Sequence, residues 1–196
     1  MTAAAIRYPK VPFQLSAQNF FMPTLKKIFN YESNKDALTM SDSDLKRFMQ
    51  MLCDKNERFG YMAVSILSIE AQTNPKVYHY IDFFFKMLDH ADPALRRRGI
   101  AMITVCSSMD TRCRIDKNIQ KLLSHSLDQS PIVSVECLKN LPDIVKNKPS
   151  VANTVFDFLI HADISVFDES LQTFVQNEFY RAITKVHFYI SKSKQN

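Results

Sequence analysis

The sequence predicts an all-α fold, and three observations favour it. Apolar residues recur at helical spacing, as at Leu45, Phe48 and Leu52. The alternation of apolar and polar residues that is typical of strands is scarce. Only two of the 196 residues are glycine, which leaves few residues for the positive-φ positions of tight β-hairpins. We therefore expect helices joined by short connections.

Prolines and capping residues divide the chain into about nine expected helices. Four prolines stand where a helix can begin with its first turn, and a good N-capping residue precedes three of them, namely Asn74, Asp92 and Ser130. The run from Ile164 to Ile190 allows one long helix or two. We expect a single domain with an N-terminal arm over 1–15, helices over 16–190 and a disordered tail over 191–196. The expected helices begin near Ser16, Asp42, Glu57, Pro75, Pro93, Asp116, Pro131, Pro149 and Ile164.

The expected helices repeat along the chain. Four stretches share large apolar residues at their first, sixth and ninth positions, and a small residue at the fifth. The stretches begin at Phe59, Leu95, Val133 and Val166, and their small residues are Ala63, Gly99, Cys137 and Ser170. A small residue at a fixed position indicates that paired helices approach closely there. The spacing between successive stretches matches the size of one helix hairpin, so we predict at least four stacked hairpins.

One turn carries a family resemblance. The stretch Asp92-Pro93-Ala94-Leu95-Arg96-Arg97-Arg98-Gly99 resembles the Asp-Pro-x-Val-Arg-x-x-Ala turn of HEAT and armadillo-like repeats. Weaker copies begin at Ser130 and Asp163. The resemblance implies an α-α superhelix (solenoid) of about four HEAT-like hairpins. It also implies that Arg96 bonds the turn of a neighbouring repeat, which is a structural role.

The formal net charge of +5 is concentrated in one stretch. Between Asp92 and Lys121, seven basic residues stand against three acidic ones. A local basic surface attracts nucleic acid or an acidic partner, whereas the alternative is a solvated face crossed by salt bridges. The candidate basic patch consists of Arg97, Arg112, Arg114, Lys117 and Lys121.

Two aromatic segments are candidates for an apolar interaction surface. The segment from Val77 to Leu88 is apolar on nearly every face, so it is either a central helix covered on most sides or, where a face is open, a protein-binding surface. The second segment, residues 179–190, either caps the array or docks onto another chain. The candidate apolar surface of the first segment consists of Tyr78, Phe83, Phe84 and Phe85.

Nothing in the sequence indicates catalysis, so we expect no enzyme, no cofactor and no metal. Two glycines cannot form a phosphate-binding glycine loop. His90-Ala91-Asp92 and His161-Ala162-Asp163 fit the end of one helix and the cap of the next. The four cysteines form no zinc-ligand pattern and are expected to be buried reduced thiols. Gly60 and Gly99 fall inside helices, where close helix contact explains Gly99 but leaves Gly60 unexplained.

These observations predict a non-catalytic protein–protein interaction or scaffold module that binds a protein or peptide. No segment is long and apolar enough for a membrane span or a signal peptide, so the expected location is cytoplasmic. The alternative is a nucleic-acid-binding repeat protein, similar to the alkylation-repeat DNA glycosylases, that uses the basic loop. The absence of tryptophan argues against a glycosylase itself. The oligomeric state is left open.

Overall fold

The computed structural model describes residues 40–193 of the chain. Backbone contacts divide the chain into Met1–Leu38 and Thr39–Asn196, and the description below concerns the second unit by itself. The arm expected over 1–15 and the helix expected near Ser16 lie outside the described residues.

The described residues are all-α, with eight α-helices, several short 3₁₀-helices and no strand. The α-helices are α2 (Asp42–Met51), α3 (Glu57–Glu70), α4 (Ile81–Met87), α5 (Pro93–Cys106), α6 (Arg114–Ser124), α7 (Pro131–Asn147), α8 (Ala152–His161) and α9 (Glu169–Ser193). The 3₁₀-helices are η2 (Pro75–Tyr80), η3 (Ser107–Met109), η4 (His125–Leu127), η5 (Pro149–Val151) and η6 (Ile164–Val166).

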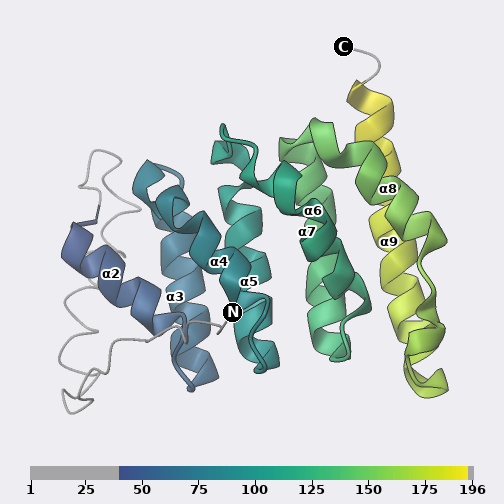
Figure 1. Ribbon diagram of the computed structural model, residues 1–196, viewed down its shortest axis with the longest axis horizontal. Coiled ribbons are helices and arrows are strands. Elements are labelled where there is room, and N and C mark those ends of the chain that lie inside the picture. Colours follow the sequence, from purple (N-terminus) through teal and green to yellow (C-terminus); the bar gives the residue numbers. More distant parts are fainter. Residues whose placement is uncertain (1–39, 194–196) are drawn as a thin grey trace, which may run out of the picture. The chain divides into compact units, whose positions relative to one another are not determined.

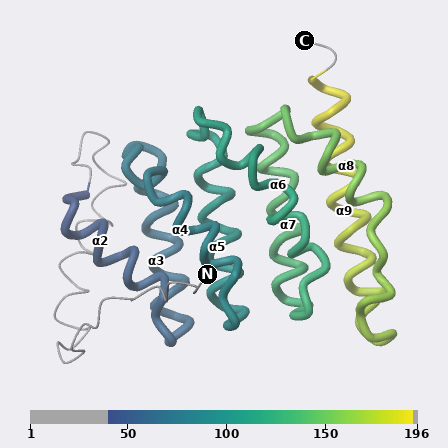
Figure 2. The backbone as a smooth tube through the Cα atoms, viewed as in Figure 1, coloured from purple at the N-terminus to yellow at the C-terminus, as the bar shows by residue number. Residues whose placement is uncertain are grey.

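The helices lie in two rows (Figures 1 and 2). Helices α3, α5, α7 and α9 form the rear row in the view of Figure 1, and each contacts the next. Helices α2, α4, α6 and α8 lie in front of them. Helix α2 packs on α3, α4 on α5 and α8 on α9, while the η4 turn that follows α6 packs on α7. Four successive helix pairs therefore share one core.

Most helix starts lie where the capping residues predict them. The side chains of Asn74 and Asp92 accept hydrogen bonds from the backbone N–H groups two residues later, at 3.0 and 2.9 Å. Ser130 is the N-cap residue of α7 as predicted, but its side chain makes no capping hydrogen bond. Helix α7 nevertheless begins at Pro131, whose fixed φ suits a first helical turn.

The small residues of the first three repeats mark buried contacts, as predicted. Ala63, Gly99 and Cys137 are all buried. A Cβ atom at Gly99 would lie 2.9 Å from the carbonyl oxygen of Phe84 and 2.9 Å from the Cβ of Met87. Helices α4 and α5 therefore approach too closely at this point for any larger residue.

The fourth repeat begins later in the chain than predicted. Val166 and Phe174, expected in the core, are 60% and 53% exposed. The segment Ile164–Val166 forms the separate turn η6, which Asp163 caps through Ser165 N. Helix α9 begins only at Glu169. The interval from Pro131, where α7 begins, to Glu169 equals the interval from Pro93, where α5 begins, to Pro131. The core residues of α9 are Val175, Glu178, Phe179, Ala182 and Val186.

Helix α9 is one continuous helix of 25 residues. It extends to Ser193, so residues 191–193, which were expected to belong to a tail, are helical. Helix α6 begins at Arg114, slightly before the expected Asp116.

Candidate interaction surface

The aromatic segment at η2 and α4 does not form a surface. Tyr78, Phe84 and Phe85 are 8%, 0% and 5% exposed, and Phe83 is half-buried. Helix α4 packs against α5, and the Tyr78 hydroxyl donates a 2.7 Å hydrogen bond to Asp110 Oδ1. The segment is therefore the central covered helix that its all-round apolar pattern allows.

The candidate basic residues do not form one free cluster. The guanidinium of Arg97 is half-buried, with Nη2 3.7 Å from Glu136 Oε2. Two residues of the front row show the same kind of pairing between successive helices. Arg114 lies 3.3 Å from Asp82, and Lys121 lies 2.7 Å from Asp89, the second residue after α4.

Arg112 and Lys117 are exposed. Acidic residues thus neutralise three of the five candidates, and salt bridges cross this face. The sequence contains a signal for the front-row pairs, since Asp82 and Asp89 each precede their basic partners by the same interval, which is close to one repeat.

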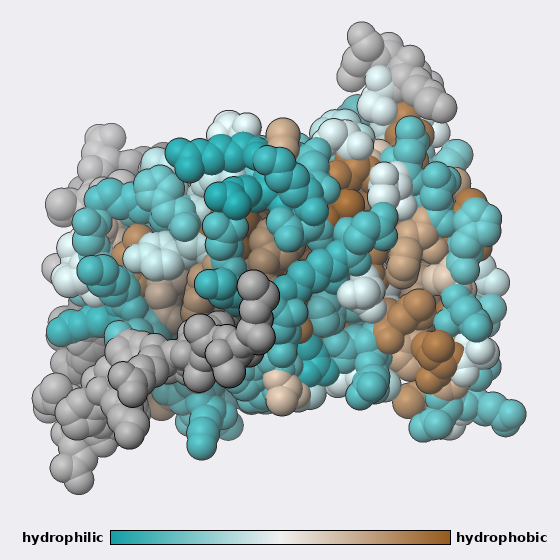
Figure 3. All heavy atoms as spheres, viewed as in Figure 1, coloured by the Kyte–Doolittle hydropathy of each residue, from teal (hydrophilic) through white to brown (hydrophobic). Residues whose placement is uncertain are grey.

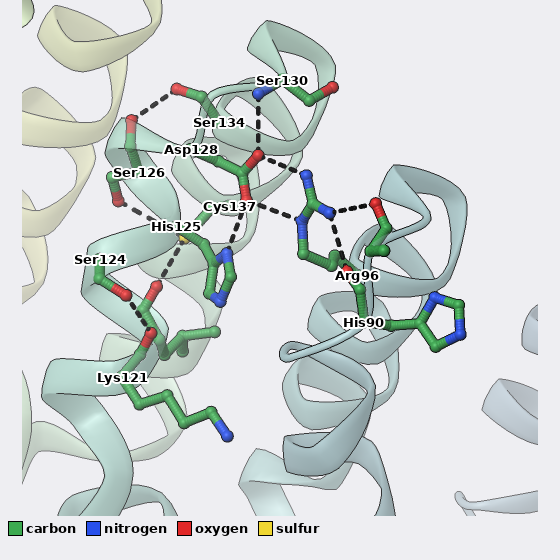
Figure 4. Close-up of polar contacts among 12 residues, drawn as sticks. His90, Arg96, Lys121, Ser124, His125, Ser126, Asp128, Ser130, Ser134 and Cys137 are labelled. Atoms are coloured by element: carbon green, nitrogen blue, oxygen red, sulfur yellow. Dashed lines mark hydrogen bonds and ion pairs between the residues drawn. The ribbon is translucent and has the colours of Figure 1, made fainter. Parts of the chain in front are cut away.

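A polar network joins α5 to the turn before α7 (Figure 4). Arg96 donates from Nε to Asp128 Oδ2 at 2.9 Å and from Nη2 to Asp128 Oδ1 at 2.7 Å. Its Nη1 donates to the carbonyl oxygens of His90 and Ala91 at 2.8 and 2.9 Å. Arg96 thus binds the turn of its own helix pair and that of the next, which is the contact that the turn motif predicts.

Asp128 is held by further groups of its own turn. His125 Nδ1 lies 2.8 Å from Oδ2, and Ser130 N donates to Oδ1 at 2.9 Å. Burial alone would raise the pKa of Asp128, but the hydrogen bonds from Arg96, His125 and Ser130 N outweigh it and lower the pKa.

Asp110 caps α6 from a position that sequence analysis missed. Its carboxylate accepts hydrogen bonds from Arg114 N and Ile115 N, both at 2.9 Å, besides the bond from Tyr78. Cys113, the residue directly before α6, has a left-handed backbone, with φ 53°, and its side chain makes no capping hydrogen bond. Asp110 stands a full turn before the first residue of the helix, which is why the usual N-cap pattern does not indicate it.

The two His-x-Asp pairs are capping structures. His90 Nδ1 accepts from Asp92 N at 2.9 Å, and His161 Nδ1 lies 2.8 Å from the carbonyl oxygen of Asp157. Asp92 and Asp163 cap the following helix and turn through bonds to backbone N–H groups two residues later. The contacts are local and structural.

The cysteines differ from the expectation of four buried thiols. Cys106 and Cys137 are buried, but Cys53 is half-buried and Cys113 is exposed. Burial raises the pKa of the Cys106 and Cys137 thiols to about 12. The exposure of Cys113 follows from its place in the connection before α6.

Exposed large apolar residues gather on the last helix pair. Figure 3 shows apolar residues over α8 and α9 and mostly hydrophilic ones over α4 and α6. Five of the seven exposed large apolar residues among those described belong to this pair and its turn, namely Ile160, Val166, Phe174, Tyr180 and Phe188. At about 100° per residue, the three exposed aromatic residues of α9 named above lie within an arc of about 120° that faces away from its buried residues.

The exposure of Phe174 does not result from the position of α9 at the end of the row. With α7 and α9 aligned on their first residues, Phe174 corresponds to Glu136, which is itself partly exposed. Phe188 lies beyond the end of α7 in this alignment and is 59% exposed. We call these two phenylalanines the α9 aromatic pair. A further helix pair packed on α9 in the way that α9 packs on α7 would not cover them.

The side of α9 that corresponds to the buried flank of α7 is more polar. Four buried positions of α7 are Val135, Leu138, Pro142 and Val145. Their counterparts in α9, in the same alignment, are Thr173, Gln176, Tyr180 and Ile183, all exposed or half-buried. This side of α9 therefore buries fewer side chains than the matching side of α7.

Comparison of the chain with protein-family models, with curated proteins and with solved structures finds no match. Among the described residues, no group of three or more His, Cys, Asp or Glu side chains is placed to hold a metal ion. Within residues 40–193, no helix combines the length and the apolar character needed to cross a membrane.

Proposed function

We propose that the chain is a non-catalytic protein-interaction module whose helix pairs form a HEAT-like α-α superhelix. The partner is a protein or peptide that covers the α9 aromatic pair. The superhelix is supported by the two rows of helices and by the bidentate bond from Arg96 to the turn of the next pair.

The exposure of Phe174 and Phe188 carries the proposal. Single exposed apolar residues are normal on protein surfaces, but here they are concentrated on one helix pair and include two phenylalanines that are more than half exposed. Aromatic side chains supply much of the binding energy at protein interfaces. Because the candidate basic residues are largely paired with acidic ones, nucleic-acid binding has less support.

A cytoplasmic location is part of the proposal. The four cysteines are unpaired, and one of them, Cys113, is exposed. An exposed thiol persists most readily in a reducing compartment.

Affinity capture from the native host tests the proposal. The wild type is compared with the Phe174→Ser/Phe188→Ser variant and with Ile69→Ser, which removes an exposed apolar side chain from α3 instead. We expect the same partner with the wild type and Ile69→Ser, and at least a tenfold loss with the double variant. Equal capture by all three folded proteins contradicts the proposal.

A further inference from the structure

Buried polar atoms without partners gather around one tyrosine ring between α3 and α5. Five buried side-chain nitrogen and oxygen atoms of the described residues make no hydrogen bond. Four of them are Tyr61 Oη, Arg97 Nε, Arg98 Nε and Arg98 Nη2. The guanidinium carbons of Arg97 and Arg98 lie 5.1 and 5.7 Å from the centre of the Tyr61 ring. Since most buried polar atoms in proteins are hydrogen-bonded, this concentration calls for a specific explanation.

Arg98 is held firmly in this position. Arg98 is only 1% exposed. Its Nη1 donates hydrogen bonds to the carbonyl oxygens of Leu52 and Asp54, both at 2.8 Å. The guanidinium lies against Gly60, where a Cβ atom would be 2.0 Å from Cζ. Gly60, unexplained by the repeat pattern, is therefore the residue that makes room for Arg98.

The unpartnered atoms of Arg98 form a complete bidentate edge. Nε and Nη2 carry two parallel N–H bonds, which match two oxygens of a carboxylate or phosphate group. Arg96, two residues earlier, uses this same edge to bind both oxygens of Asp128. In Arg98 the edge has no acceptor among the described residues.

Two guanidiniums, Arg97 and Arg98, and two carboxylates, Glu57 and Glu136, act electrostatically on Tyr61, but neither carboxylate pairs directly with Arg98. Arg98 forms no ion pair with an acidic side chain among residues 40–193, and Arg97 has only Glu136, at 3.7 Å. Leaving a buried cation without a counter-charge is strongly unfavourable. Burial raises the pKa of the Tyr61 phenol, which therefore stays protonated and can donate a hydrogen bond.

We propose that the Nε/Nη2 edge of Arg98, together with Arg97 Nε and Tyr61 Oη, binds a small free oxyanion of the phosphate or carboxylate class. The four donor atoms are themselves buried, so the oxyanion reaches them when the partly exposed side chains of Tyr61 and Arg97 move aside. It supplies the acceptor oxygens that the Nε/Nη2 edge of Arg98 lacks. The site is separate from the α9 aromatic pair, so neither proposal depends on the other.

Thermal unfolding of the full chain tests this site. Sodium phosphate, sodium acetate and sodium chloride are titrated in the low millimolar range at constant ionic strength. We expect phosphate or acetate to raise the Tm in proportion to the logarithm of its concentration above the Kd, by roughly 5–10 °C at a hundred times the Kd, and chloride to have no such effect. A response to phosphate alone identifies a phosphate-class ligand, whereas an equal response to acetate identifies any small carboxylate as sufficient.

Variants separate specific binding from a general salt effect. Tyr61→Phe keeps the ring and removes one donor, and Arg97→Met removes another, so both are expected to raise several-fold the oxyanion concentration needed for the same increase in Tm. Arg98→Met is expected to abolish it. Arg181→Met, which removes an arginine paired with Glu178 on the exposed side of α9, is the matched control and keeps the full response.

Two outcomes overturn the proposal. The first is a wild type whose Tm rises no more with either oxyanion than with chloride. The second is an equal response in the wild type, Tyr61→Phe and Arg97→Met, because it would reflect general exclusion of the salt from the protein surface. Both outcomes are measured on the wild type, Tyr61→Phe and Arg97→Met, so the test does not depend on whether Arg98→Met folds.

Discussion

Arg96 and Asp128 join two successive helix pairs through two parallel hydrogen bonds, at 2.9 and 2.7 Å. Both side chains are largely buried, with 13% and 6% of their surfaces exposed. We expect Asp128→Asn to lower the free energy of unfolding by about 3–5 kcal/mol, because it leaves the Arg96 charge buried without its counter-charge. Urea denaturation measures the change.

An exposed pair in the front row provides the matched control. Asp89 and Lys121 also join two helix pairs, but 67% and 34% of their side chains are exposed. Asp89→Asn is expected to change the stability by less than about 1 kcal/mol. Equal losses for Asp128→Asn and Asp89→Asn would show that the Arg96 bond does not hold the two pairs together.

Gly60→Ala separates helix propensity from packing. Alanine favours a helix over glycine by about 1 kcal/mol, so an unconstrained position would be stabilised. Because the new Cβ would lie 2.0 Å from Arg98 Cζ, we expect a loss of about 1–3 kcal/mol instead. Thermal or urea unfolding of the variant measures the sign directly.

A second substitution shows whether Arg98 is the cause of that loss. In the Arg98→Ala background the clash is absent, so Gly60→Ala is expected to be neutral or stabilising there, with a coupling of at least about 1 kcal/mol. Gly99→Ala has no such rescue, because its Cβ would meet the Phe84 carbonyl oxygen at 2.9 Å. The same loss from Gly60→Ala in both backgrounds would contradict the assigned contact.

Acid is expected to weaken the fold through Asp110. Burial alone would raise the pKa of this carboxyl, but hydrogen bonds from Tyr78, Ile115 N and Arg114 N and the charge of Lys148 lower it below the ordinary value. A carboxyl with a lowered pKa in the folded state stabilises the fold above its unfolded pKa of about 3.9, and this stabilisation disappears as the pH falls through the folded pKa.

The free energy of unfolding, measured against pH, tests this contribution. The wild type is expected to lose stability steadily below about pH 4. Asp110→Asn is less stable at neutral pH but shows a shallower decline, since position 110 no longer takes up a proton. Parallel curves for the two proteins would show that Asp110 is not one of the groups responsible.

Nucleic-acid binding is expected to be weak. Because Asp82 and Asp89 neutralise Arg114 and Lys121, we expect no retention on heparin or DNA at about 0.15 M salt. Arg112→Glu/Arg114→Glu should behave like the wild type. Firm retention of the wild type that the double variant loses would support the nucleic-acid alternative.

Local sequence signals predict the helix boundaries well, because a cap or a proline acts within one turn. Pro93 and Pro131 begin helices, and Gly99 marks a close helix contact, as expected. The fourth repeat shows the limit of such signals, since Ile164 and Val166 fit the apolar pattern but belong to a separate 3₁₀ turn. The spacing of apolar residues alone does not distinguish the first turn of a long α-helix from a separate 3₁₀ turn.

Contacts between repeats account for what the sequence left unexplained. Gly60 accommodates Arg98, which belongs to the next helix pair along the chain. Arg114 and Lys121 are adjacent to acidic groups of the preceding helix pair. The exposure of Phe174 depends on where α9 begins, which the capped turn η6 determines.

Site-specific photo-crosslinking in the native host tests the interaction surface most directly. A photoreactive phenylalanine analogue is placed at Phe174 or Phe188, and at the exposed control positions Lys139 on α7 and Lys117 on α6. We predict that one protein partner is crosslinked from positions 174 and 188 and not from 139 or 117. Crosslinking of that partner from 117 or 139 with equal yield, or no crosslink from 174 and 188 in the folded protein, would contradict the account.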